Sequence, residues 1–391
     1  MKKVRFGIVG IGNMGANHAD RIFNAKDDLF ELTAVCDINP KRYDALVKRL
    51  PEAKLNFYEN YEDMYESGDI DAVIVATPHF LHPEMCISAL NHGIHTICEK
   101  PEGVYTKQVK QLNEVATNSD KLFTVMFNQR TDSVYRKMHE MVERGDLGEI
   151  KRITWLITNW YRSQSYYDSS AWRATWKGEG GGVLFNQCPH QLDLIQWVTG
   201  LKPSKVRAFC HFGKWHDIEV EDDVTAYLEY PNGATGVFVT STADWPGANR
   251  LEISGTKGTL VCENSKVTYT KLAIDEREFN ATWTGGFGRP DSETIEVETD
   301  GYNPQHMGII SNFAKAILGI EPLYVDGREG INGVQLMDAM LLSTWLDKTV
   351  ELPIDDELYL SELNKRIATS REKVVEDVIR DVDMSKTFNK A

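Results

Sequence analysis

Long apolar runs are missing from this chain of 391 residues. None approaches the roughly 18 residues that a membrane-spanning helix requires, which argues against a transmembrane protein. Low-complexity tracts and internal repeats are missing as well. The first residues, 1 to 4, lead straight into a predicted strand, without the longer apolar segment and cleavage site of a secretory signal. We therefore expect a cytoplasmic protein.

Positive charge is also scarce. The 43 lysines and arginines face 58 acidic residues, which gives a net charge of -15. Nucleic-acid phosphates need a basic surface, so nucleic acid is not an expected partner, and an anionic membrane is not expected either. The hydrophobic share of 42% and the charged share of 26% are ordinary for a globular protein. The length predicts two domains.

Cysteines are few, and no CxxC or metal-type spacing connects them. They are Cys36, Cys86, Cys98, Cys188, Cys210 and Cys262. We expect reduced, mostly buried thiols. The acidic run from His216 to Asp223 is another candidate for metal ligands, but a solvated turn before a strand is the better interpretation. No metal site is predicted.

The first informative stretch is a glycine-rich turn that includes Gly10, Gly12, Asn13 and Met14. It joins a strand at 4–9 to a helix at about 16–24, and a second strand at 32–36 ends at Asp37, 22 residues after Gly15. A GxGxxG turn alone is weak evidence. Strand, turn, helix, strand and acid at this spacing strongly indicate a dinucleotide site, with the pyrophosphate at the helix N-terminus.

Asp37 bears on the choice of cofactor. Its carboxylate accepts hydrogen bonds from ribose hydroxyls and repels a 2′-phosphate, which favours NAD over NADP. Lys41 and Arg42 follow closely, and Arg42 is able to accommodate such a phosphate, so NADP stays the second choice. Asp37 can also serve as an N-cap before Pro40 and Lys41.

Strands and helices alternate up to about residue 128, which predicts right-handed βαβ units and a parallel sheet. We expect a Rossmann domain at 1–128. The second half, 129–391, reads as an α/β domain with a large, mostly antiparallel open sheet. Its charged, helical tail past Ser361 has no predicted place. Ligands of parallel sheets sit at the carboxyl ends of the strands, where the sequence has Thr77, Pro78, His82, Glu99, Lys100 and Asn128.

Lys100 closes an apolar strand at 95–98. A buried ammonium without a partner is costly, so an isolated lysine here would ordinarily turn into solvent. Its place at a strand end favours a functional role instead. Among the nearby histidines, His82 is expected to orient its loop and His18 to be structural. His306 opens a later helix and is able to reach a substrate.

The second constellation is the stretch from Gly180 to Asp193. A helix after the glycines would place Asn186 and His190, four residues apart, on one face. Asp193 follows on the same side and can hold the imidazole in one tautomer. A buried histidine with a purely structural role is the alternative. The loop before it is rich in rings and suits either a carbohydrate or the packing of the domain interface; it contains Trp160, Tyr161, Arg162, Tyr166, Tyr167, Trp172, Arg173 and Trp176.

Together these motifs resemble the Gfo/Idh/MocA family of glucose–fructose oxidoreductase, inositol dehydrogenase and their relatives. The glycine turn, the loop at 77–82, Glu99-Lys100-Pro101, the stretch 180–193 and the turn at 327–330 occur in the family's order and spacing. One departure is that inositol dehydrogenases usually have Asp where this chain has Asn186. Asn cannot take up a proton, so a proton-relay role at this position is in doubt.

The resemblance implies an NAD-dependent oxidoreductase acting on a secondary hydroxyl of a sugar, glycoside or cyclitol. It implies His190 as base, with an unperturbed pKa suited to neutrality. It also implies that Lys100 binds the reacting oxygen, that Glu99, Trp172 and Arg173 lie near the cofactor, and that Tyr161, Arg162, Tyr167, Trp176, Asn186 and Asp193 lie near the substrate. A glycosidase working by transient oxidation and a non-catalytic NAD sensor are the alternatives. A homodimer or homotetramer is expected, because Val237 to Val239 put apolar side chains on both sheet faces.

Overall fold

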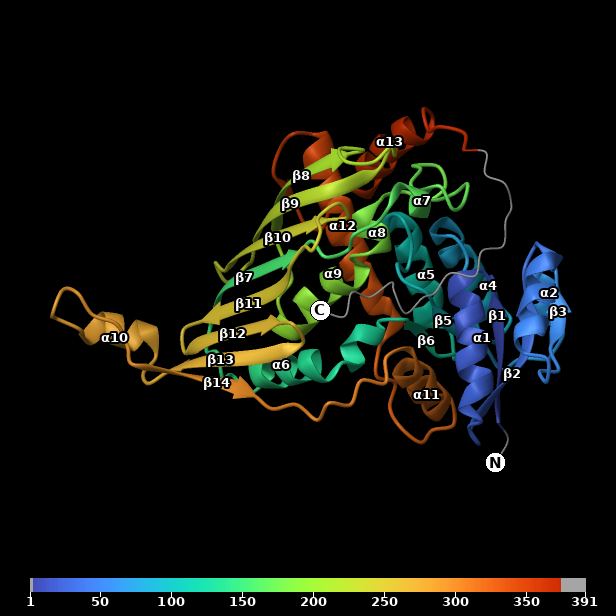
Figure 1. Ribbon diagram of the computed structural model, residues 1–391, viewed down its shortest axis with the longest axis horizontal. Helices are drawn as coiled ribbons and strands as arrows, with labels where there is room; N and C mark the ends of the chain where they lie inside the picture. The colour runs from blue at the N-terminus through green and yellow to red at the C-terminus, as the bar shows by residue number, and fades with distance from the viewer. Residues whose placement is uncertain (1–2, 374–391) are drawn as a thin grey trace.

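The first half of the protein is a six-stranded parallel sheet in the order β3-β2-β1-β4-β5-β6 (Figure 1). The structure is a computed structural model that describes residues 3–373. The strands are β1 (Val4–Val9), β2 (Phe30–Cys36), β3 (Asn56–Tyr58), β4 (Ala72–Val75), β5 (His95–Cys98) and β6 (Phe123–Val125). Because the order reverses between β1 and β4, a crevice for a ligand opens at the carboxyl ends of these strands.

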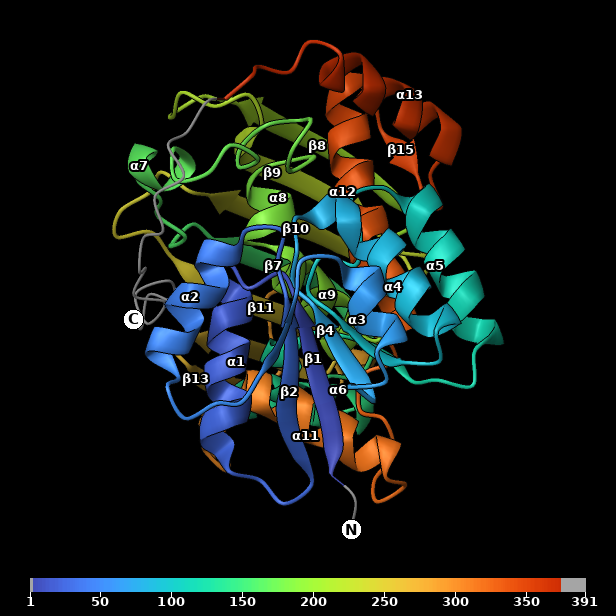
Figure 2. The same cartoon turned by 90° about the vertical axis from the view of Figure 1, so that its right-hand side faces the viewer.

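Helices cover both faces of this sheet (Figure 2). They are α1 (Asn13–Ala25), α2 (Pro40–Arg49), α3 (Tyr61–Glu66), η1 (His79–Leu81), α4 (His82–Asn91), α5 (Thr106–Asn118) and η2 (Asn128–Thr131). The N-cap of α2 is Asn39, whose side chain accepts from the backbone N–H of Lys41. The alternative role of Asp37 as this cap is therefore wrong, and its carboxylate is left for the turn beside it.

The second half is built on a nine-stranded sheet in the order β14-β13-β12-β11-β7-β10-β9-β8-β15. Its strands are β7 (Ile150–Ile157), β8 (Lys205–Phe212), β9 (Glu221–Glu229), β10 (Thr235–Ser241), β11 (Asn249–Gly255), β12 (Gly258–Glu263), β13 (Lys266–Leu272), β14 (Ser292–Val297) and β15 (Val350–Glu351). Within this second sheet, the β7–β10 pair is parallel and the other pairs of described strands are antiparallel. This confirms the predicted fold class of a Rossmann domain followed by a mostly antiparallel α/β domain.

One face of the nine-stranded sheet is covered by helices (Figure 1). The helices of this half are α6 (Ser133–Glu143), α7 (Gln164–Tyr167), α8 (Val183–Asn186), α9 (Pro189–Thr199), α10 (Glu276–Thr282), α11 (His306–Ile317), η3 (Gly327–Glu329), α12 (Gly330–Trp345) and α13 (Asp356–Ile367). Trp155 and Phe238 are buried beneath them, whereas Phe209 and Tyr227 remain exposed on the sheet. The charged, helical tail was predicted past Ser361. Helix α13 extends into it as far as Ile367, and residues 374–391 lie outside the described residues.

The buried side chains form two hydrophobic cores, one for each sheet. The residues of each core do not come from one continuous stretch of the chain. Ile309, Ile310 and Phe313 of α11 pack into the core of the first sheet, although they follow the second sheet in sequence. The boundary predicted after residue 128 falls where β6 passes into η2. The chain therefore returns to the Rossmann unit late, and α11 brings side chains to the junction of the two units.

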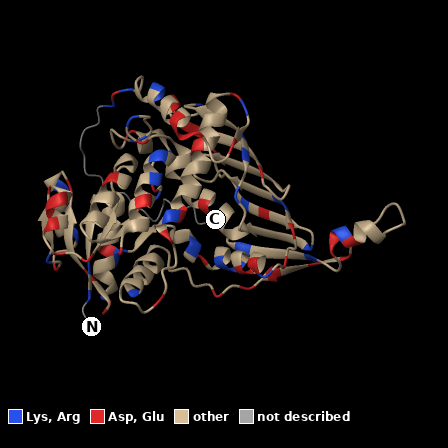
Figure 3. Cartoon of the chain, turned by 180° about the vertical axis from the view of Figure 1, so that it is seen from behind, with Lys and Arg blue, Asp and Glu red and all other residues tan. Residues whose placement is uncertain are grey.

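Several expectations from composition can be compared with the structure. All six cysteines are free and buried, which confirms the prediction for them. No helix among the described residues is long and apolar enough to span a membrane. Acidic and basic residues are interleaved along the ribbon (Figure 3).

Candidate active site

The glycine turn between β1 and α1 has the shape of an anion cradle. Gly10 has φ of 83°, and a Cβ on it would lie 2.8 Å from the backbone oxygen of Ala76. A Cβ on Gly15 would lie 1.9 Å from the backbone oxygen of Gly10, so neither position admits a side chain. Helix α1 starts at Asn13 with no side-chain cap and no acid in its first turn. Its N-terminus is thus open to a pyrophosphate.

Asp37 and Arg42 meet beside this turn. The Asp37 carboxylate accepts from the backbone N–H groups of Ile11, at 3.0 Å, and Asn39, at 2.9 Å. Nε of Arg42 lies 3.9 Å from Oδ1, the same carboxylate oxygen that accepts from Asn39. Asp37, which favours NAD, and Arg42, which would favour NADP, therefore lie side by side. Two backbone hydrogen bonds hold the Asp37 carboxylate in position.

Glu99 and Lys100, at the end of β5, have separate partners. Nε2 of His18 lies 2.6 Å from Oε1 of Glu99, and both side chains are buried. Although burial opposes ionisation of Glu99, the hydrogen bond and charge of His18 hold its pKa well below the usual range. The Lys100 Nζ donates to the backbone oxygen of Asn186 at 2.9 Å. Burial lowers the pKa of Lys100, against the opposing effect of Glu99. The lysine is thus held across the junction, toward the second unit.

The predicted single helix carrying Asn186 and His190 is wrong. Helix α8 ends at Asn186 and α9 begins at Pro189, whose ring removes a backbone donor and prevents a continuous helix. Lys100 still interacts with both residues. Its Nζ donates to the backbone oxygen of Asn186, and its charge acts on His190. Burial, and then the charge of Lys100, lowers the pKa of His190 to about 3. The imidazole is therefore neutral at pH 7, rather than half protonated near neutrality as its unperturbed pKa would suggest.

Asp193 does not orient His190, contrary to the prediction. Its two carboxylate oxygens accept from Arg130 at 2.8 and 2.5 Å. Arg130 also donates to Glu329 at 2.6 Å. Nδ1 of His190 is buried without a hydrogen-bond partner among the described residues. Asp193 therefore fixes α9 to η2, and sequence spacing could not reveal this because Arg130 lies 63 residues away.

The aromatic loop divides into two groups. Trp172 packs edge-on against His79 of the Rossmann unit, with ring centroids 5.6 Å apart. Arg173 lies over the rings of Tyr166 and Trp172, at 4.3 and 4.7 Å. Nη1 of Arg173 donates to the hydroxyl of Tyr166 at 2.5 Å. These three loop residues therefore meet at the junction, as expected for Trp172 and Arg173 near a cofactor.

For the other loop aromatics, the structure favours packing in two cases. The Tyr167 hydroxyl donates to Thr242 at 2.7 Å, and its side chain is buried. Trp176 is buried between Phe212 and Trp345. Predicted substrate contacts of Tyr167 and Trp176 are therefore not supported, because core packing occupies both rings.

Tyr161 is exposed, whereas Arg162 is partly buried and its Nη1 donates to the backbone oxygen of Tyr161 at 2.9 Å; substrate contacts of both residues stay predictions. Tyr161 is 46% exposed and lies 6.2 Å from the ring of Trp245. Arg162 lies over the rings of Trp160 and Tyr166, at 5.7 and 5.1 Å. These side chains form the outer edge of the loop, where a bound molecule would meet rings and a donor together.

The remaining strand-end residues support the loops. The ring nitrogens of His82 lie 2.8 Å from the backbone oxygens of Thr77 and Pro101, so His82 ties the Thr77-Pro78 loop to the Lys100 loop. Asn128 donates to Gln305 at 2.5 Å. Beside Gln305, His306 packs against His18 with ring centroids 5.4 Å apart. The start of α11 thus reaches the strand ends, a contact that only the late return of the chain explains.

The acidic run at 216–223 forms a turn as predicted, but only part of it is solvated: Asp217 is exposed, whereas Glu221 and Asp222 are buried. Asp222 is buried and accepts from the backbone N–H groups of Lys214, Trp215 and His216. Among the described residues, no group of three or more His, Cys, Asp or Glu side chains could hold a metal ion. The run therefore closes a turn before β9.

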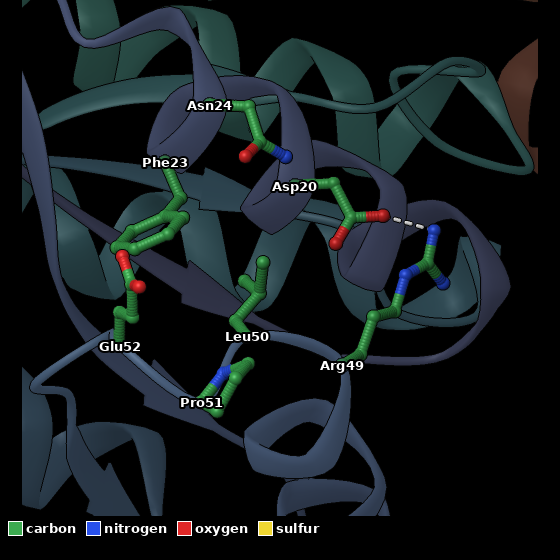
Figure 4. Close-up of a pocket in the computed structure, with 7 residues that line it drawn as sticks. All are labelled: Asp20, Phe23, Asn24, Arg49, Leu50, Pro51 and Glu52. Atoms are coloured by element: carbon green, nitrogen blue, oxygen red, sulfur yellow. Dashed lines mark ion pairs between the residues drawn. The ribbon is translucent and has the colours of Figure 1, made fainter.

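A cavity of about 430 Å³ lies away from this junction (Figure 4). It is lined by Asp20, Phe23, Asn24, Arg49, Leu50, Pro51 and Glu52. Arg49 and Asp20 form an ion pair across it. The cavity is at the C-terminal ends of α1 and α2, hence at the amino ends of the strands, opposite the crevice that a nucleotide would occupy.

Comparison with known proteins agrees with this geometry. Residues 4–127 match the model of the oxidoreductase family with an NAD-binding Rossmann fold, and residues 135–261 match the GFO/IDH/MocA C-terminal domain. Fold and site thus define an NAD-binding oxidoreductase. More particularly, the chain belongs to the GFO/IDH/MocA family.

Relatives of this chain extend over most of its length. Myo-inositol 2-dehydrogenase of Thermotoga maritima is 25% identical over 84% of this chain and 92% of its own length. Levoglucosan dehydrogenase of Pseudarthrobacter phenanthrenivorans is 25% identical over 89% of this chain and 98% of its own. The WlbA dehydrogenase of Bordetella pertussis, solved in complex with NADH and UDP-GlcNAcA, is 27% identical with a TM-score of 0.76, covering 90% of this chain and all of that one.

Proposed function

We propose that this protein transfers hydride between NAD and a secondary hydroxyl or ketone of a sugar, glycoside or inositol in the cytoplasm. The observation that carries the proposal is the bridge from Lys100 Nζ to the backbone of Asn186. It puts a cationic donor from the Rossmann unit beside the segment that carries His190. The glycines and the open helix end of the turn formed by β1 and α1 suit a dinucleotide. Helix α1 is linked to the same strand end, because its His18 contacts Glu99, the neighbour of Lys100.

The bound nicotinamide supplies the hydride acceptor in such a reaction. The protein's own residues handle the proton and the charge. His190 is neutral, so its free imidazole nitrogen accepts the hydroxyl proton. Lys100 donates to the same oxygen and stabilises the negative charge that develops there. Glu99, held by His18, keeps a carboxylate next to Lys100 and so favours its charged form.

The substrate class rests on the loop and on the relatives. Tyr161 presents an exposed ring, and the partly buried guanidinium of Arg162 lies beside it, donating to the backbone oxygen of Tyr161. Rings can cover the C–H faces of a sugar while donors bind its hydroxyls. The relatives are named for inositol and for levoglucosan, and one solved relative holds UDP-GlcNAcA. All three are polyhydroxylated rings, which is the class proposed here.

A screen of free sugars, inositols, glycosides and UDP-sugars with NAD tests the proposal. We expect NADH absorbance to rise with at least one member of the panel. Glycoside cleavage that consumes no net NAD would instead identify the glycosidase alternative. NAD binding without turnover of any compound in the panel would favour the sensor, which the presence of both Lys100 and His190 argues against.

Replacing Asp37 with serine should weaken NAD binding and relax discrimination against NADP. The carboxylate accepts two backbone hydrogen bonds at the end of β2 and repels a 2′-phosphate there. Removing it leaves Arg42 free to attract that phosphate. Titration of both cofactors, followed by protein fluorescence, measures the ratio of dissociation constants. A wild type that already prefers NADP would contradict the assignment.

We also propose that the open face of the nine-stranded sheet joins two or four copies of the chain. Phe209, Tyr227 and Leu156 are exposed on this sheet, although antiparallel sheets normally present polar residues to water. Light scattering at micromolar concentration should give the mass of a dimer or tetramer. Tyr227→Lys should shift the mass toward the monomer, whereas Lys205→Glu at the sheet margin is the matched control. A wild-type monomer would contradict the proposal.

A further inference from the structure

A buried carboxylate lies against Asn186, the position where this chain departs from the inositol dehydrogenases. Glu179 is 1% exposed. Its Oε1 accepts from Nδ2 of Asn186, and its Oε2 accepts from the backbone N–H of Ala174 at 2.6 Å. The carboxyl group that an aspartate would bring to position 186 is thus present one side chain away. Burial raises the pKa of Glu179, while the charge of Arg173 and the hydrogen bonds from Ala174 and Asn186 favour its ionised form.

Glu179 fixes which way the Asn186 amide points. An ionised carboxylate has acceptors only, so Nδ2 must face Glu179 and Oδ1 must face the other way. Oδ1 accepts from the Tyr166 hydroxyl at 2.9 Å and from Gln187 at 3.0 Å. The Tyr166 oxygen in turn accepts from Arg173. Hydrogen bonds therefore run in one direction, from Arg173 through Tyr166 and Asn186 to Glu179.

The same carboxylate supports both sides of the site. Ala174, which it binds, has φ of 57°, a left-handed conformation that a non-glycine residue adopts only when held. Arg173 precedes it, and its Nη1 lies 3.7 Å from Oε1 of Glu179. On the other side, the backbone oxygen of Asn186 accepts from Lys100. Displacing Asn186 would therefore displace the acceptor that positions Lys100.

We propose that Glu179 is a positioning residue for the reaction, which supplies through Asn186 the negative charge that an aspartate at position 186 would otherwise carry. This inference rests on the proposed function. It differs from a purely structural role, in which Glu179 would only hold the turn at Ala174. If the role is purely structural, the carboxylate must stand at position 179. If the proposed role is right, one carboxylate is needed, at either position 179 or position 186.

Exchanging the two groups separates these roles. Glu179→Gln removes the charge, and Asn186→Asp puts two carboxylates in contact, which disfavours the ionisation of both. We expect each single variant to lower kcat by about tenfold or more, in line with couplings between groups in direct contact. The double variant, Glu179→Gln with Asn186→Asp, restores one carboxylate and one amide. Its kcat should recover to within about threefold of wild type.

Glu221 offers a matched control. It is a second buried carboxylate beside the same glycine-rich segment, accepting from the backbone N–H groups of Gly182 and Leu184 at 2.8 and 3.1 Å. No hydrogen bond joins it to Asn186 among the described contacts. Glu221→Gln combined with Asn186→Asp should therefore fail to restore kcat. Thermal unfolding of every variant, measured at the assay pH, shows whether the fold survives.

The assay uses a sugar confirmed with wild-type protein and saturating NAD. Recovery in the exchange variant, but not in the Glu221 control, is the expected result. An exchange variant that melts like wild type yet stays as slow as the slower single variant would overturn the positioning role alone. Absence of turnover in wild type across the panel would overturn the proposed function, and this inference with it.

Discussion

Lys100→Met should reduce turnover about a hundredfold or more and should affect NAD binding much less than turnover. Methionine keeps the bulk of the stem but removes the charge and every donor. The developing oxyanion would lose its main electrostatic partner, by analogy with oxyanion donors worth about 3–4 kcal/mol. The variant also loses the hydrogen bond from Nζ to Asn186. Steady-state rates with a confirmed substrate, alongside NAD titrations, measure the effect.

His190→Ala should lose general-base assistance, which is typically worth about a hundredfold to ten-thousandfold. Because Lys100 and His190 act on the same proton transfer, the double variant should be much less than multiplicatively slower. NAD affinity of the His190 variant serves as the internal control, since the glycine turn and Asp37 lie in the other unit. Near-normal turnover in either single variant would refute the mechanism while leaving the fold intact.

Arg130→Met should be the most destabilising single change at the junction. Arg130 is buried, and its guanidinium binds Asp193 through two hydrogen bonds and Glu329 through a third. Removing it leaves the Asp193 carboxylate buried without a cationic partner. Breaking a buried pair from one side costs about 3–5 kcal/mol of the free energy of unfolding. Urea unfolding at neutral pH, followed by fluorescence, measures the loss.

Arg144→Met is the control for this prediction. Arg144 pairs with Glu140 and Asp146 at an exposed position, where such pairs contribute about 0–1 kcal/mol. The sign of the pH dependence is a second check. Without Arg130, burial and then the charge of Glu329 act on Asp193 unopposed and raise its pKa in the folded state above that of the unfolded chain. The stability lost in Arg130→Met should therefore be greatest at neutral pH and shrink as the pH falls. Equal losses in the two variants would contradict the prediction.

The fold was predictable where the sequence pattern is periodic. Apolar runs such as residues 72–75, followed by helical segments, predicted the parallel sheet. Strand β14 was missed because nearly all of its side chains are exposed. The two-residue β15 is too short to leave a pattern. Strands at the margin of a sheet bury little, so their sequences carry little signal.

The sequence predicted which residues belong to the candidate site better than it predicted which residues contact one another there. Lys100 and His190 follow from local motifs, and the structure brings their segments together. The role given to Asp193 failed because its partner, Arg130, lies far away in sequence. Glu179 was not singled out, although it stands directly before the three glycines. An acid next to a glycine-rich turn, seven residues before an Asn that replaces Asp, was the available signal.

The six buried cysteines can report on unfolding of the protein, because each thiol is accessible to a reagent only when the surrounding core opens. Cys36, Cys86 and Cys98 lie in the core of the first sheet, and Cys188, Cys210 and Cys262 lie in the core of the second. Burial raises the pKa of Cys36, Cys188 and Cys262 to about 12, so almost no thiolate is present while the fold is closed. A cysteine is therefore alkylated only after the core around it has opened. The rates at which the two sets of thiols react, resolved by mass spectrometry, give the opening frequency of each half of the enzyme separately, without any engineered label.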